Sequence, residues 1–222
     1  MNSLIEVVQG LLERTYDCDS GVAQIGRFVI GDRGLRRFYG VAEVVEHVGS
    51  AAGAARTLVR ESAGRLHASI YIPDEQLQAL EAAPPQHGLG ERNVAPFAAL
   101  VEEVDHLLVL AERKREARGV SLFELELHAN ISKYLVLARF LAGAGGRLDE
   151  PRRLWLHRRL FDEPLRSMAP AVRQRYEDAE RWAVRLIHGI RPLSPGERVS
   201  ELRRFHRADA AGKIGRIRKL SA

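Results

Sequence analysis

Residues 121–143 read SLFELELHANISKYLVLARFLAG and determine how the rest of the chain is arranged. Ser121 with Glu124 three positions later forms a capping box, which begins a helix, and Gly143 is a residue type that commonly ends one. At about 100° per residue, this helix has apolar side chains on two sides. One side carries Leu122, Leu125, Ala129, Val136 and Phe140, and the other carries Leu127, Ile131, Tyr134, Ala138 and Leu141. We therefore expect this helix to be covered on both sides, at the centre of the fold.

The segment before it predicts a second long helix. Asn93 can cap its start, Pro96 fits only a first turn, and Gly119 can end it. One apolar stripe runs along it, formed by Phe97, Leu100, Val101, Val104, Leu108 and Ala111. Because so short a connection leaves the two helices side by side, we expect an antiparallel helical pair.

The N-terminal region has the patterns of a small sheet. Residues 66–72 alternate apolar with more polar side chains, and with residues 56–61 they predict a hairpin across the short connection 62–65. Residues 22–30 are rich in β-branched and aromatic side chains and predict a further strand. Helices are expected at 3–14, at 35–48 and from Pro73 to Leu80. The region is therefore expected to form an antiparallel sheet with flanking helices.

Residues 83–92 form the clearest linker, because prolines and glycines are concentrated there. Beyond the antiparallel pair, further helices are expected at 150–163 and 170–188, and another begins at the capping box of Ser194. The predicted fold class is α+β, predominantly helical. Residues 1–82 are expected to form a small α/β subdomain with the antiparallel sheet, and residues 93–222 a bundle of about five helices with a basic C-terminal segment.

Composition places this chain of 222 residues, 45% apolar and 28% charged, among ordinary globular proteins. Cys18 is the only cysteine, which excludes an intrachain disulfide and a four-thiolate zinc site and is typical of a reducing compartment. The N-terminus lacks the basic start of a secretory signal, and no apolar run approaches the roughly 20 residues of a membrane span. We expect a cytoplasmic protein.

Positive charge is concentrated at the carboxyl end. From Arg191 to Ala222 there are nine Lys and Arg residues against three Asp and Glu residues, whereas the preceding 190 residues are nearly neutral. Such segregation favours a non-catalytic interaction or adaptor protein whose basic end contacts an acidic protein surface or nucleic acid. The expected partner-binding residues are Arg203, Arg204, Arg207, Lys213, Arg216, Arg218 and Lys219. This interpretation requires no cofactor.

A group of acidic and imidazole side chains on the helical pair allows a second interpretation. Glu103 and His106 form a Glu-x-x-His pair of the kind found in di-iron carboxylate bundles, but such bundles need two of these pairs. Residues 102–108, EEVDHLL, also resemble the His-Glu-x-x-His helix of small zinc metallopeptidases, with Glu102 in place of the first histidine. Glu126 in Glu-x-x-Ala-Asn resembles the later glutamate ligand of those enzymes.

The resemblance implies a metal-dependent hydrolase that binds zinc or iron through Glu102, His106 and Glu126, with Glu103 as general base. The replacement at Glu102 changes the charge and softness of such a site. The same side chains would also fit a solvated helix face, where Glu102 and His106 form an i, i+4 pair that contributes only tenths of a kcal/mol. From the sequence alone, the interaction protein is the favoured prediction, and the hydrolase and a nucleic-acid-binding protein are its alternatives.

Overall fold

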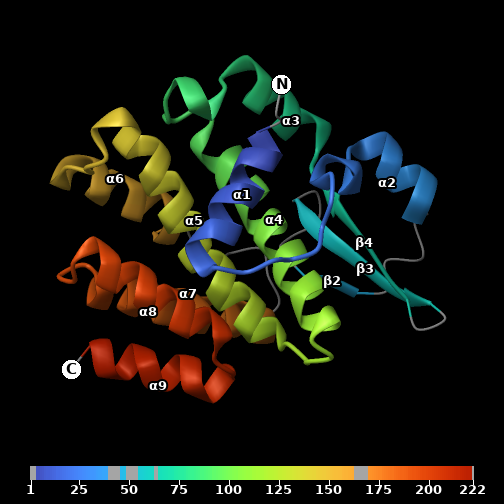
Figure 1. Ribbon diagram of the computed structural model, residues 1–222. Helices are drawn as coiled ribbons and strands as arrows, with labels where there is room; N and C mark the ends of the chain where they lie inside the picture. Colours follow the sequence, from blue (N-terminus) through green and yellow to red (C-terminus); the bar gives the residue numbers. More distant parts are fainter. Residues whose placement is uncertain (1–3, 40–45, 49–54, 63–64, 163–169, 222) are drawn as a thin grey trace.

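The computed structural model describes residues 4–39, 46–48, 55–62, 65–162 and 170–221 (Figure 1). Its helices are α1 (Leu4–Tyr16), α2 (Asp32–Tyr39), α3 (Asp74–Ala82), α4 (Val94–Arg115), α5 (Leu122–Ala142), α6 (Glu150–Phe161), α7 (Pro170–Ile190), α8 (Pro195–Arg207) and α9 (Ala210–Leu220). Its strands are β1 (Val29–Ile30), β2 (Glu46–Val48), β3 (Arg56–Ser62) and β4 (Arg65–Tyr71). The expected α+β, predominantly helical class is confirmed. None of the described helices has the length and apolar character needed to cross a membrane.

The sheet has the strand order β1-β4-β3-β2. The predicted hairpin is confirmed: β3 and β4 pair antiparallel, with Leu58 opposite Ser69, and β2 pairs antiparallel with β3. β1 instead pairs parallel with β4, so the sheet is not antiparallel throughout. The strand expected at 22–30 shrinks to Val29–Ile30, because Gln24 has a left-handed backbone (φ 53°) and a 3-10 turn follows it. The helix expected at 35–48 is also wrong: α2 covers Asp32–Tyr39 and β2 follows, while residues 40–45 lie outside the described residues.

The central position of α5 is confirmed. It packs against α4, α6, α7 and α1, and its side chains Leu127, Ile131 and Leu137 have no exposed surface (Figure 1). Both halves of the Ser121–Glu124 capping box are present at its start, as the sequence predicts. The end of α4 differs from the prediction: the left-handed residue after the helix is Ala117 (φ 52°), not Gly119. Helix α4 therefore ends earlier, and a longer connection leads to α5.

The two sides of the linker share one hydrophobic core. Helix α4 packs on β3 and β4, and the core cluster contains Ile70 of the sheet together with Val101 of α4 and Leu127 of α5. Within the linker, the Asn93 side chain accepts from the Gly90 amide and donates to two backbone carbonyls, so it organises the loop before α4. The predicted division of the chain into residues 1–82 and 93–222 stays a prediction. In the structure, α4 packs against both parts.

The C-terminal helices belong to the same body. Helix α9 packs on α7 and α8, and Ile217 is fully buried. A side chain at Gly189 of α7 would lie within 2.9 Å of the Leu220 backbone, so this glycine permits the close approach of α9. The basic C-terminal segment is therefore docked on the protein.

Candidate metal centre

The antiparallel pairing of α4 and α5 brings three possible metal ligands together. Glu102 and His106 lie one helical turn apart on α4, and Glu126 faces them from α5. One ligand atom from each of these side chains lies within 4.8 Å of the other two. The residues are those that the metallopeptidase resemblance identifies. We call these three residues the α4/α5 cluster.

The sequence left open that the three cluster residues and Glu103 lie on a solvated helix face. The structure excludes this for Glu103, His106 and Glu126. Glu103 is 2% exposed, His106 is fully buried and Glu126 is 1% exposed. Only Glu102 retains partial exposure. Strand β3 covers α4 at Glu103, as the hydrogen bonds from Thr57 to Glu103 show, and α7 packs on α5 with Tyr176 beside Glu126.

Glu103 orients the imidazole of His106. Its Oε2 accepts a hydrogen bond from the Thr57 hydroxyl at 2.8 Å and lies 3.5 Å from His106 Nδ1. A carboxylate on one ring nitrogen leaves the other nitrogen for a metal, which is the usual arrangement around metal-bound histidines. This contact suits a positioning role for Glu103, and its expected role as general base stays a prediction.

Two polar atoms of the α4/α5 cluster are buried without a hydrogen bond among the described residues. They are Nε2 of His106 and Oε1 of Glu126. A buried polar atom without a partner costs roughly 1–3 kcal/mol, so such atoms are uncommon in proteins. A cation between a ring nitrogen and a carboxylate oxygen would satisfy both.

The electrostatics of the cluster favour a cation. Burial disfavours a charged His106, but the hydrogen bond to Glu103 and the charge of Glu126 outweigh it and raise the pKa of His106 to about 9. Burial raises the pKa of Glu126 to about 7. Glu102 differs: burial alone would raise its pKa, yet the Lys133 ammonium, 2.6 Å from Oε2, holds the pKa below its usual range. In the metal-free protein, protons on His106 and Glu126 occupy the positions that a metal would take.

The donor set fits zinc or ferrous iron. One imidazole and two carboxylates suit these ions, and three protein ligands leave a coordination position open for solvent or substrate. Catalytic zinc sites have this open position, whereas structural sites use four protein ligands.

Sequence reasoning missed the groups that surround the cluster. Thr57 precedes Glu103 by 46 positions on a strand, and no local pattern joins them. Lys133 of α5 pairs with Glu102 of α4, and no local pattern joins these two residues either. Tyr176 of α7 lies beside Glu126. Burial and the charge of Glu126 raise the pKa of Tyr176 and keep its hydroxyl protonated.

Most of the expected partner-binding residues interact with other side chains of the protein. Lys213 is 1% exposed and lies 3.3 Å from Glu124, and its role in partner binding stays a prediction. Arg203 and Arg207 pair with Asp17, Arg204 and Arg216 with Glu201, and Arg218 lies over the Trp182 ring, while Lys219 is exposed. Capture of an acidic partner by this segment stays a prediction that its geometry does not favour.

Comparison of the chain with protein-family models, with curated proteins and with solved structures found no match.

Proposed function

We propose that the protein is a metal-dependent hydrolase whose divalent cation is held by Glu102, His106 and Glu126. The observation that carries the proposal is the convergence of these side chains around two buried atoms without partners, His106 Nε2 and Glu126 Oε1. The resemblance of residues 102–108 and 126–130 to the helices of small zinc metallopeptidases supports the same ligand set.

The cation would act as a Lewis acid and lower the pKa of a water molecule in its open position. The protein would orient the His106 ligand and place positive charge beside the metal. Glu103 holds the ring of His106 through Nδ1, and Thr57 holds Glu103. Lys133 places a fixed positive charge beside Glu102, which suits a site where negative charge develops during ester or amide hydrolysis. The protonated Tyr176 hydroxyl could donate to the same developing charge.

The direct test combines metal analysis with hydrolysis assays on the full chain. Protein is purified without added metal, its metal content is measured by plasma mass spectrometry, and chromogenic carboxylic esters, phosphoesters and peptide amides are offered as substrates. We expect hydrolysis that disappears on chelation and returns with zinc or ferrous iron. His106→Ala and Glu126→Gln should each lose hydrolysis and one equivalent of metal.

Glu180→Gln is the matched control. Glu180 is a partly buried carboxyl on α7 whose pKa burial also raises to about 7, but it lies outside the α4/α5 cluster. This variant should keep metal and activity, whereas equal losses in Glu180→Gln and Glu126→Gln would indicate a general effect of removing a buried acid. A metal content that neither cluster variant lowers, or binding without any chelator-sensitive hydrolysis, would overturn the proposal.

A further inference from the structure

A second group of polar side chains lies buried along the same helical pair, on residues that the first centre does not use. His128 Nδ1 lies 2.8 Å from Asp105 Oδ2, and His128 Nε2 lies 3.0 Å from Nδ1 of His206. The far nitrogen of His206, Nε2, lies 2.8 Å from Oε2 of Glu112. The result is a continuous chain from Asp105 to Glu112 through two imidazoles, all of them buried.

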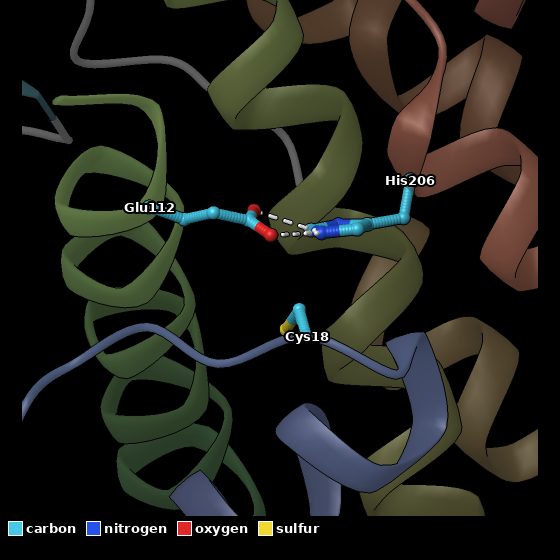
Figure 2. A group of neighbouring side chains, drawn as sticks. All are labelled: Cys18, Glu112 and His206. Atoms are coloured by element: carbon cyan, nitrogen blue, oxygen red, sulfur yellow. Dashed lines mark hydrogen bonds and ion pairs between the residues drawn. The ribbon is translucent and has the colours of Figure 1, made fainter. Parts of the chain in front are cut away.

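Cys18 lies at the end of this chain. Figure 2 shows its sulfur beside the contact between Glu112 and His206, on the loop that follows α1. One ligand atom from each of the three residues lies within 4.8 Å of the others. A cavity of about 10 Å³ adjoins them, and its lining includes Cys18, Glu112 and His206. A space of this size is at the lower limit for a single water molecule, so one small ion fits it.

We propose that Cys18, Glu112 and His206 form a second metal site, selective for a thiophilic divalent cation such as zinc. A thiolate, an imidazole and a carboxylate are all zinc ligands, and together they would balance the charge of the ion. This site is independent of the α4/α5 cluster, because the two share no ligand.

The arrangement behind His206 supports this assignment. Asp105 and His128 hold its Nδ1 side, which leaves Nε2 directed at Glu112 and the cavity. Metal-bound histidines are usually oriented in this way by a partner on the second ring nitrogen. The Tyr16 ring stacks on His206 with centroids 5.1 Å apart and packs on His128, which restricts both imidazoles.

Metal binding would change the protonation of Cys18 and the contact between Glu112 and His206. Burial first, and then the charge of Glu112, raise the pKa of the Cys18 thiol to about 12, so the metal-free thiol is mostly protonated and reacts slowly. A divalent cation would replace that proton and the direct contact between Glu112 and His206. The ligands come from the loop after α1, from α4 and from α8, so the ion would join three segments that are distant in sequence.

Cobalt(II) provides a readout specific to this site. A cobalt–thiolate bond adds an intense near-ultraviolet charge-transfer band, and Cys18 is the only cysteine in the chain. We expect this band to appear on cobalt titration of the metal-free protein and to saturate at one ion per thiol. It should be absent in Cys18→Ser and strongly weakened in Glu112→Gln, while Glu126→Gln should keep it. That control separates failure of this site from failure of the proposed hydrolase centre.

Thiol reactivity gives a second measurement that needs no variant. Zinc at two equivalents, enough to fill both proposed centres, should slow the reaction of Cys18 with a disulfide reagent at least tenfold, and chelation should restore the rate. Cobalt binding without a charge-transfer band, or a thiol reaction rate that zinc does not change, would overturn the proposal and leave the group as a hydrogen-bonded chain only.

Discussion

The competition between proton and metal at His106 gives the sharpest prediction for the first centre. The pKa of His106 is about 9, so at pH 7 only about 1% of the metal-free protein carries the neutral imidazole that a metal requires. Glu126, with a pKa of about 7, is also about half protonated at pH 7, so apparent zinc affinity should rise about 100-fold between pH 7 and pH 9, equivalent to about 3 kcal/mol, and level off above that. Below pH 7 the slope should steepen to two protons, because Glu126, with a pKa of about 7, is then also protonated.

Glu103→Gln is the perturbation that tests this reasoning. Glu103 is the main cause of the raised pKa of His106, so its neutral isostere should lower that pKa and flatten the profile between pH 7 and pH 9. The same change removes the carboxylate that orients the ring, which should weaken affinity above pH 9 by about 10–100-fold. The profiles of wild type and variant should therefore converge towards pH 7.

The measurement is zinc competition with a chromophoric chelator from pH 6 to pH 10. Both proteins carry Cys18→Ser, so that the second site does not contribute. An affinity that does not change between pH 7 and pH 9 in wild type, or an unchanged slope in Glu103→Gln, would refute the assignment of His106 as a ligand that must lose a proton.

Two further predictions concern stability, measured by urea unfolding of metal-free protein. Raised pKa values in the folded state mean that stability is present at low pH and lost as pH rises, through about 7 for Glu126 and about 9 for His106. The lowered pKa of His128 opposes this trend below about pH 6.5, so the free energy of unfolding should fall most clearly between pH 7 and pH 9, by up to about 1.4 kcal/mol per pH unit. A flat or rising profile in that range would contradict the raised pKa of His106. Gly189→Ala should destabilise by about 1–3 kcal/mol because its new methyl group meets Leu220, whereas Gly215→Ala in α9 meets nothing and should stabilise by up to about 1 kcal/mol. Equal effects of the two substitutions would show that α9 does not pack on α7 as described.

The elements that were predicted correctly depend on residues close together in the sequence. The capping boxes at Ser121 and Ser194 depend on residues three positions apart, and both are present. The β3–β4 hairpin and the central position of α5 follow from periodicity within single segments. β1 could not be predicted in the same way, because its parallel partner β4 lies about 40 residues away along the chain.

The candidate site was predicted in its residues but not in its burial. Glu102, His106 and Glu126 were identified by a resemblance to metallopeptidase helices, and the structure brings them together. The polar face of α4 suggested solvent, because an amphipathic pattern does not reveal that a sheet covers the other side. The burial of Lys213 was not predicted for a similar reason: its partner Glu124 lies about 90 positions earlier in the chain.

Zinc content of the Cys18→Ser protein, with and without Glu126→Gln, tests the central claim most directly. Both proteins are equilibrated with buffered zinc, desalted and analysed by plasma mass spectrometry, with circular dichroism to verify the fold. We predict one zinc ion per chain in Cys18→Ser and none in the double variant. Zinc absent from Cys18→Ser, or retained in full by the double variant, would show that the α4/α5 cluster is not a metal centre.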